Sequence, residues 1–344
     1  MTEKLDNVYV EGTALVAGRL EKEGPLSNYF DKTYKNYNID ESLELSEVKM
    51  NKDVLKILMD KTNKKEKDID LIVGGDLLNQ LCASMYATKD LNRPCLGVFS
   101  ACATSMESII VASKFIEKKK DKKAICLTSS HNLAEEKQFR NPTEYGYTKP
   151  KTATFTSTGA AAIMLTNKKT DIKVTNYTIG TIQDLNQKDP NNMGAVMTPA
   201  AADTIYKHLT NLNIAPDYYD LILTGDLGIF GKEILKDYMK QEYNITLENY
   251  NDCGAMLYDM EKQKQITAGG SGPVCSCLVN YGYIYNMLKE KKLKKVLLVT
   301  TGALFSPTFT FQKQNILSIA HAVSLEAINW HIYFHSYFAE CYVL

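Results

Sequence analysis

The chain contains one eight-residue pattern twice, 150 residues apart. DLIVGGDL occupies residues 70–77 and DLILTGDL occupies residues 220–227, and six of the eight letters agree. Turns of small residues, helical patterns and further apolar strand patterns follow both copies. We therefore expect two halves built on one plan, which need not do the same job.

The patterns after the two copies predict elements in a similar order. The first half shows an extended run at 94–101, a helix at 102–116 and strands at 122–130 and 158–166. The second half shows helices at 229–241 and 273–290, around a glycine turn, and strands at 294–303 and 319–327. Short apolar runs that alternate with helix-length segments indicate parallel strands joined by crossover helices. Two such units in tandem predict a layered α/β body.

Composition narrows the class of protein. A chain of 344 residues with 44% apolar content favours two domains or two fused halves. Positive and negative side chains balance at 40 each, and basic residues form short runs such as 289–295, which argues against a nucleic-acid partner. Eight cysteines without an apolar N-terminal signal core predict reduced thiols. No run reaches the ~18–20 apolar residues of a membrane span, so we expect a soluble chain.

Cys102 is the residue whose position most suggests a function. It follows the strand pattern VFSA and opens a helical pattern. Unpaired backbone N–H groups and the helix macrodipole can lower a thiol pKa there from ~8.5 to ~3.5–7.5, as a nucleophile requires. The same N–H groups can hold a carboxylate. An inert buried cysteine is nevertheless the commonest outcome for this residue type.

Several longer stretches resemble one protein family. Together with the repeats, these are EKEGPLSNYFDKTY (21–34), FSACATSMES (99–108), TSSHNLAEEKQFRNPTEYG (128–146), MTPAAADTI (197–205), AGGSG (268–272) and TTGALFSPT (300–308). They resemble the stage V sporulation protein AD family, a branch of the thiolase and ketoacyl-synthase fold. The resemblance runs from about Glu21 to Glu326. It implies an αβαβα body of two fused βαβαβ-type halves, residues 1–178 and 179–326, followed by a divergent tail at 327–344.

The resemblance also implies a ligand and a setting. The ligand is pyridine-2,6-dicarboxylate (dipicolinate), either free or as its calcium chelate, which is loaded into the developing spore alongside membrane proteins of the stage V system. The chain is then expected on the cytoplasmic side, peripheral to the spore inner membrane. Condensing-enzyme relatives dimerise, so a homodimer is expected by analogy. No cofactor is expected, and Cys275 and Cys277 would project about 200° apart on a helix, which does not suit a shared zinc.

The family's enzymes serve the cysteine with two residues from the second half. One is a histidine just after the strand equivalent to DLIL, and the other is a histidine or asparagine in the glycine-rich turn. This chain has Asp226 near the first place and Ser271 in the second. Removing such groups typically costs factors of ~10² to 10⁴ in rate. The resemblance therefore implies a protein that binds without catalysis.

Two alternatives stay open. His131 follows the strand at 122–130 and is the histidine best placed to reach Cys102. A Cys–His pair keeps a cysteine-dependent acyltransferase or condensing enzyme as the rival function. A structural partner protein whose pocket is a relic is the third hypothesis.

A flat dianion needs donors or cations for both of its carboxylates. The turn at Cys102, Ala103 and Thr104 offers backbone N–H groups, and His131 offers a ring N–H. Arg140 could form a bidentate fork, with Lys149 further along the same loop. The remaining candidate pocket residues are Asp76, Asn79, Met197, Thr198, Asp226, Gly269, Gly270 and Gly272.

Each of these candidates has a plainer interpretation. Asp76 and Asp226 can cap the helices that follow them. Met197 and Thr198 fit core packing, and Arg140 and Lys149 fit a solvated surface. The tail from Ala327 has aromatic residues at helical spacing and two histidines, at 331 and 335. It fits an interfacial helix, a partner-binding helix, a weak metal site or an extension without a role.

Overall fold

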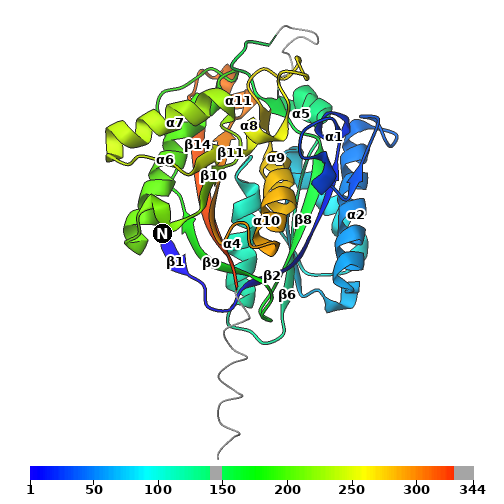
Figure 1. Ribbon diagram of the computed structural model, residues 1–344. Coiled ribbons are helices and arrows are strands. Elements are labelled where there is room, and N and C mark those ends of the chain that lie inside the picture. Colours follow the sequence, from blue (N-terminus) through cyan, green and yellow to red (C-terminus); the bar gives the residue numbers. More distant parts are fainter. Residues whose placement is uncertain (140–148, 329–344) are drawn as a thin grey trace, which may run out of the picture.

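The protein is built around one continuous sheet whose two five-stranded halves, here called the first and the second sheet, have the same strand order and meet where β2 pairs with β9 (Figure 1). The computed structural model describes residues 1–139 and 149–328. The first sheet has the order β2 (Tyr9–Ala17), β8 (Gly159–Thr166), β6 (Lys123–Ser130), β4 (Leu71–Gly75) and β5 (Cys95–Gly97). The second has the order β9 (Ile172–Ile179), β14 (Leu317–Ala327), β13 (Lys295–Leu304), β10 (Leu221–Thr224) and β11 (Tyr250–Asp252).

Strand directions repeat as well as strand order. In the first half β8 runs antiparallel to both β2 and β6, whereas β6, β4 and β5 are parallel to one another. In the second half β14 runs antiparallel to both β9 and β13, whereas β13, β10 and β11 are parallel. The two repeated segments are thus the strands β4 and β10, at equivalent places. The expected duplication is confirmed at the level of topology.

Helices form three layers around the sheets. The central layer is α4 (Thr104–Ile116) and α9 (Pro273–Cys277), which continues through a π-helical segment, Leu278–Ile284, into α10 (Tyr285–Lys289). α4 packs on strands of both halves and on α9. The outer layers are α2 (Leu43–Thr62) with α3 (Cys82–Thr88) on the first half, and α6 (Met193–Leu212) with α7 (Gly228–Tyr243) on the second. The layered αβαβα body implied by the resemblance is therefore observed.

Shorter elements complete the body. They are β1 (Thr2–Lys4), α1 (Arg19–Lys22), β3 (Lys32–Thr33), α5 (Asn132–Phe139), β7 (Phe155–Thr156), α8 (Cys253–Leu257), β12 (Gly270–Ser271) and α11 (Pro307–Phe311), with short 3₁₀ turns at 27–29, 66–68, 79–81, 89–91 and 216–218. Across residues 1–139 and 149–328, no helix is long and apolar enough to cross a membrane.

Two details differ from the sequence-based expectation. The closing strands β8 and β14 are antiparallel to their neighbours, whereas alternating patterns had suggested parallel strands. Apolar periodicity defines which face of a strand is buried but not its direction. The expected boundary after residue 178 falls inside β9, which pairs with β14 of the second half. All but two residues of the tail from residue 327 lie outside the described residues.

Candidate functional site

Cys102 lies on a tight turn between β5 and α4. Ala101 adopts a left-handed conformation, with φ +50°, and this presents the next residue at the end of the sheet. The turn is closed by the Ala103 N–H, which donates to the Ser100 carbonyl (3.0 Å), and by the Thr104 N–H, which donates to the Ala101 carbonyl (3.2 Å). A Cβ on Gly302 of β13 would meet the Ser100 carbonyl at 2.1 Å, so only glycine permits this approach.

The closed turn changes the predicted role of its N–H groups. Ala103 and Thr104 are fully buried, and their N–H groups are bonded within the turn. Neither residue lines the cavity described below. The expectation that these two N–H groups hold a ligand carboxylate is therefore wrong. α4 begins at Thr104, two residues after Cys102.

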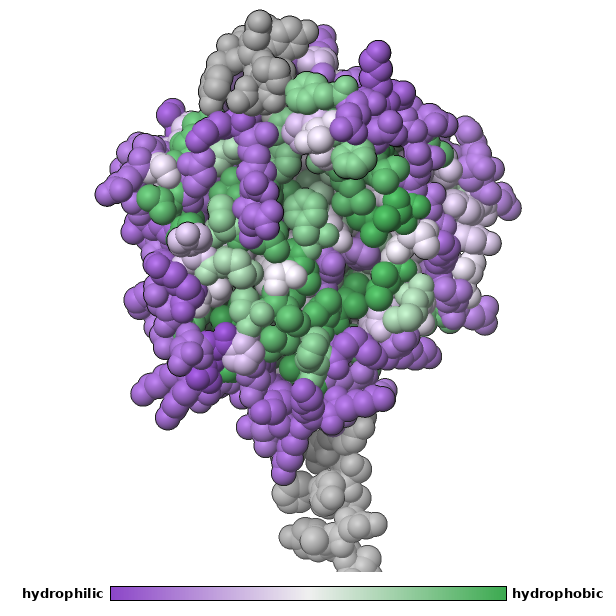
Figure 2. All heavy atoms as spheres, turned by 180° about the vertical axis from the view of Figure 1, so that it is seen from behind, coloured by the Kyte–Doolittle hydropathy of each residue, from purple (hydrophilic) through white to green (hydrophobic). Residues whose placement is uncertain are grey.

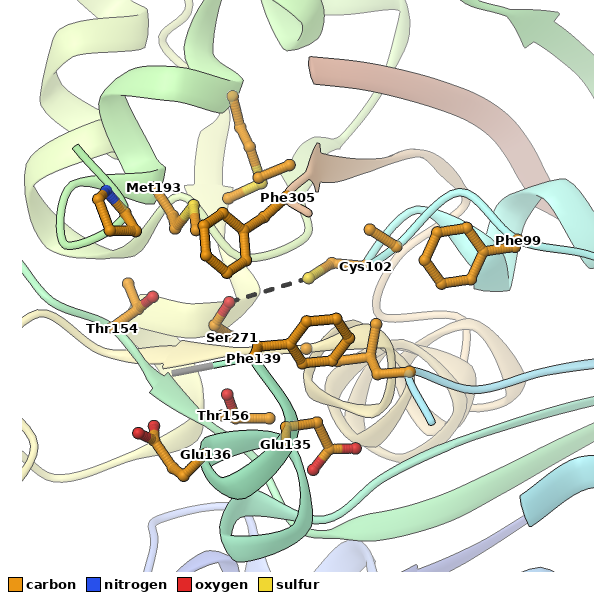
Figure 3. A pocket seen from close by; sticks show the side chains of 16 residues that line it. Phe99, Cys102, Glu135, Glu136, Phe139, Thr154, Thr156, Met193, Ser271 and Phe305 are labelled. Atoms are coloured by element: carbon orange, nitrogen blue, oxygen red, sulfur yellow. Dashed lines mark hydrogen bonds between the residues drawn. The ribbon is translucent and has the colours of Figure 1, made fainter. Parts of the chain in front are cut away.

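Two segments of the second half converge on Cys102. The Ser271 hydroxyl, in β12, lies 3.9 Å from the Cys102 sulfur (Figure 3). Asp226 lies behind Ser271 and accepts hydrogen bonds from the Ser271 hydroxyl (2.8 Å), the Gly272 N–H (3.2 Å) and the Thr301 hydroxyl (2.7 Å). The segment after the strand DLIL thus brings the carboxylate of Asp226 to the cysteine site, and the glycine-rich turn brings the hydroxyl of Ser271.

The electrostatics of this cluster oppose thiolate formation. Burial raises the pKa of the Cys102 thiol well above its usual range, and the nearby Asp226 carboxylate raises the same pKa further. Burial also raises the pKa of Asp226, against the effect of its three donors. The pKa shift is therefore opposite to the lowering expected from the helix, because burial and then the Asp226 charge both favour the protonated thiol.

The two repeated aspartates have different partners. Asp76 accepts from the Leu78 N–H (3.0 Å), the Ser84 N–H (2.8 Å) and the Ser84 hydroxyl (2.6 Å), so it anchors α3 as a cap would. The equivalent N–H groups at the start of α7, those of Leu227 and Gly228, donate instead to Asp252 (2.9 Å each). Capping is therefore the wrong interpretation for Asp226.

A cavity opens beside Cys102 and Ser271. It encloses about 680 Å³ of space, including its open mouth. Phe99, Phe139 and Phe305 form aromatic walls from three different elements of the fold (Figure 3). The complete lining consists of Leu77, Phe99, Ala101, Cys102, Glu135, Glu136, Phe139, Thr154, Thr156, Pro190, Met193, Met197, Ser271, Gly272, Ala303 and Phe305.

Glu135 connects this cavity to a cluster of buried carboxyl groups. Glu47 accepts from the Ser129 hydroxyl (2.7 Å), and Glu135 accepts from the His131 N–H (2.8 Å). Burial raises the pKa of Glu47 to about 8, and the nearby Asp76 charge adds to this effect. Burial and Glu47 together hold the pKa of Glu135 well above its usual range. Burial and Glu47 therefore favour the protonated form of Glu135 at the cavity, and this form can donate a hydrogen bond.

His131 does not reach Cys102. Its ring Nε2 lies 2.9 Å from the Tyr37 carbonyl, its side chain is fully buried, and it is absent from the cavity lining. Burial lowers the pKa of this imidazole. His321 lies near the turn, with its Nε2 3.3 Å from the Ser100 hydroxyl, and burial lowers its pKa to about 4. The predicted Cys–His pair is not formed within the part of the chain that the structure describes.

Some of the other predicted residues line the cavity and some do not. Met197 and Gly272 line the cavity with Cys102. Asp76, Asn79, Thr198, Gly269 and Gly270 do not line it: the Thr198 hydroxyl donates to the Gly194 carbonyl (2.8 Å), and the Gly269 carbonyl accepts from the Phe155 N–H (2.9 Å). Arg140 lies outside the described residues. Lys149 forms an ion pair with Glu136 (2.5 Å).

Sequence reasoning missed most of the cavity wall. Phe99 and Phe305 stand in the motifs FSACATS and TTGALFS, and Ser271 stands in AGGSG. These motifs drew attention to Cys102 and to the glycines, and not to the neighbouring side chains that form the wall. Glu135 and Glu136 stand in the resembling stretch 128–146, close to His131 and Arg140, but no pattern there distinguishes them from surface acids. Among the described residues, no group of three or more His, Cys, Asp or Glu side chains is arranged to hold a metal ion.

Solved structures share this architecture. The E117Q form of OleA from Xanthomonas campestris superimposes with a TM-score of 0.60 at 11% identity, covering 94% of this chain and 99% of that chain. The 3-oxoacyl-[acyl-carrier-protein] synthase III from Aquifex aeolicus VF5 superimposes with a TM-score of 0.56 at 13% identity, covering 93% and 99%. At these identities the similarity establishes the thiolase-like fold alone.

Sequence comparison is more specific. The stage V sporulation protein AD of Bacillus subtilis (strain 168) is 44% identical over 320 residues, which cover 93% of this chain and 94% of that protein. The model of the stage V sporulation protein AD family matches residues 2–326. The chain belongs to the stage V sporulation protein AD family, and its fold is thiolase-like.

Proposed function

We propose that this sporulation protein binds pyridine-2,6-dicarboxylate in the cavity beside Cys102 and does not transform it, and that this binding serves uptake of the ligand into the developing spore. One observation carries the proposal. The sulfur is met by Ser271, backed by Asp226, in a cavity with aromatic walls. Such a site can hold a flat ring, but a carboxylate and a hydroxyl stand where the family's thioester chemistry uses the imidazole of a histidine and the side chain of a histidine or asparagine.

The lining suits a flat aromatic acid. Three phenylalanines offer faces and edges to a pyridine ring. The Thr154 and Thr156 hydroxyls and the protonated Glu135 are donors for carboxylate oxygens. Glu136 also lines the cavity, where it is paired with Lys149 (2.5 Å). We propose that the ligand binds either as the free dianion or as its neutral calcium chelate.

The rival function is acyl transfer from a thioester to Cys102. The cysteine on a strained turn in this fold is the feature that favours it. The raised thiol pKa opposes it, because the thiolate is the nucleophile. Intact mass measured after incubation with acetyl-CoA separates the two functions, since only the rival leaves an acyl group on Cys102.

Binding is tested by calorimetric titration with dipicolinate, with and without calcium. Benzene-1,3-dicarboxylate serves as the control ligand, because it keeps both carboxylates and lacks the ring nitrogen. Phe305→Ala should weaken binding about tenfold or more, as expected for the loss of a buried aromatic contact. Phe311→Ala is the matched control, because Phe311 is exposed on α11 and lies outside the cavity. Equal affinity in both variants would place the ligand elsewhere.

We also propose that the protein acts as a homodimer beside the spore inner membrane, with membrane proteins of the stage V system. β5 is the edge strand of the first half, and all three of its residues are exposed. Leu96 and Phe99 present apolar surface there, and Figure 2 shows a continuous hydrophobic area on one face of the molecule. An uncovered apolar edge strand favours pairing with a second copy. Light scattering of the purified chain tests this, and a monomer at micromolar concentration contradicts it.

A further inference from the structure

Three lysine-rich loops meet at the end of the molecule opposite the cavity. They comprise residues 117–123, 167–171 and 289–295, and we call them together the lysine end. The Asn167 side chain donates to the carbonyls of Ile116 and Lys119 and accepts from the Lys122 N–H (3.0 Å), which joins the first two loops. The Lys294 carbonyl accepts from the Ala327 N–H (2.8 Å), and the Asp171 carbonyl accepts from the Ile328 N–H (2.7 Å). The third loop is therefore joined to the second through the end of β14.

The lysine end carries a strong positive charge although the whole chain is neutral. Its three loops hold twelve lysines against four acidic residues and contain no arginine. Nine of these lysines are exposed, namely Lys118, Lys119, Lys120, Lys168, Lys169, Lys289, Lys291, Lys292 and Lys294. Ion pairs join Lys168 to Asp121 (3.5 Å) and Lys292 to Glu290 (2.7 Å) inside the lysine end, and Lys122 to Asp70 (2.7 Å) beside it. Twelve lysines thus stand against three such pairs, and most of the positive charge is uncompensated by them. Figure 2 shows hydrophilic side chains gathered around this end of the molecule.

We propose that the lysine end is a docking surface for an anionic lipid bilayer. Lysine ammonium groups are point charges on flexible stems, which suits a diffuse layer of lipid headgroups better than one fixed carboxylate or phosphate. The chain continues from Ile328 at this end, and the sequence beyond it includes Trp330, Tyr333 and Phe334. Tryptophan and tyrosine are enriched where bilayers meet water. An acidic protein surface is the other kind of partner, and the test below distinguishes it.

Docking in this orientation leaves the ligand cavity facing away from the lipid. β13 runs from Lys295 at the lysine end to Leu304, between Ala303 and Phe305 of the cavity wall. A strand of this length spans about 30 Å at ~3.3 Å per residue. The proposal does not depend on the identity of the ligand, because changes at the lysine end are too distant to alter the cavity.

The test is sedimentation of the full chain with vesicles of phosphatidylglycerol and phosphatidylcholine, compared with vesicles of phosphatidylcholine alone. The proposal predicts binding to the anionic vesicles only, and loss of that binding at ~0.5 M salt, where charges are screened within a few ångströms. The variant K118E/K120E/K294E should bind at least tenfold more weakly. The variant K240E/K264E/K313E makes the same change in net charge at exposed lysines elsewhere and should stay within twofold of the parent chain.

Three results would overturn the proposal. Equal weakening in both variants would mean that overall charge, and not the lysine end, determines binding. Failure of the parent chain to bind anionic vesicles at low salt would exclude lipid, and an acidic protein would then be the partner for this surface. Undiminished binding by K118E/K120E/K294E would assign the contact to another part of the chain. Circular dichroism shows that each variant is folded, and calorimetry with dipicolinate on the same variants tests the proposed ligand separately.

Discussion

Asp76 and Asp226 stand at the same place in the two copies of one repeated strand, yet they face different parts of the molecule. Asp76 bonds to Leu78 and Ser84, close to it in sequence and in its own half. Asp226 bonds to Ser271 and Gly272 and lies beside Cys102, which the other half contributes. The first aspartate holds a helix start, whereas the second determines the chemistry of a thiol.

The difference arises from a third aspartate. Asp252, at the end of β11, takes the Leu227 and Gly228 N–H groups that would otherwise bond to Asp226. Asp226 can therefore bond at the cysteine site while the N–H groups at the start of α7 keep an acceptor in Asp252. A duplicated fold can keep the same strand and the same residue while one added partner gives that residue a new role.

The largest expected effect is on stability, and there the two copies should behave alike. Asp76→Ala and Asp226→Ala each remove a buried acceptor of three hydrogen bonds and leave its donors unpaired. Each variant should lose about 3 kcal/mol of unfolding free energy, since each unsatisfied buried group costs ~1–3 kcal/mol. Urea denaturation of both variants measures this. A loss below ~1 kcal/mol for one of them would mean that its carboxylate is solvated or replaced by water.

The next effect is a pH dependence that Glu47 gives to the first copy. Burial raises the pKa of Glu47 from an ordinary 4.5 to about 8, and Asp76 contributes to this shift. Folding therefore favours the protonated acid, and this contribution to stability is lost as pH rises from about 4.5 to about 8. Glu47→Gln keeps a neutral side chain throughout and should be more stable than the parent chain at pH 8, with the difference vanishing near pH 4.5.

Thermal denaturation of both proteins across this pH range measures the difference. Glu44→Gln, on the same helix, is the control, because the ion pair with Lys137 lowers the pKa of Glu44 and gives the opposite sign. Parallel pH profiles for the parent chain and Glu47→Gln would show that Glu47 titrates normally.

A smaller effect separates the two aspartates most cleanly. Asp226→Asn removes the negative charge beside the thiol, so the pKa of Cys102 should fall and the thiolate fraction at pH 7 should rise. Alkylation of Cys102 by iodoacetamide, followed by peptide mass spectrometry, should be about tenfold faster than in the parent chain. Asp76→Asn should leave that rate within twofold. If Asp76→Asn reacted faster, or if the two variants reacted equally fast, the charge of Asp226 would not control the reactivity of Cys102.

Much of the fold could be predicted from sequence because the repeat marks equivalent strands. DLIVGGDL and DLILTGDL became β4 and β10, and the small-residue runs became the closing strands β8 and β14. Strand direction and the start of the second half were not predictable from local patterns. The direction of β8 depends on the long connection through α5 and β7, and β9 carries no signal that assigns it to β14.

The sequence predicted which segments come together at the site, but not the chemical environment that they create. The resemblance to the family placed Asp226 and the AGGSG turn near Cys102. The left-handed Ala101 and the closed N–H groups of the turn depend on the close approach of Gly302, which no local pattern encodes. His131 follows the correct strand but bonds to Tyr37, a residue 94 positions away in sequence.

The most direct measurement is the intact mass of the purified protein after incubation with acetyl-CoA at neutral pH, paired with calorimetric titration of dipicolinate on the same sample. We predict an unchanged mass together with saturable binding of the dicarboxylate. An acetyl group on Cys102, released again with turnover, would contradict the account of a cysteine whose protonated form is favoured by burial and by Asp226.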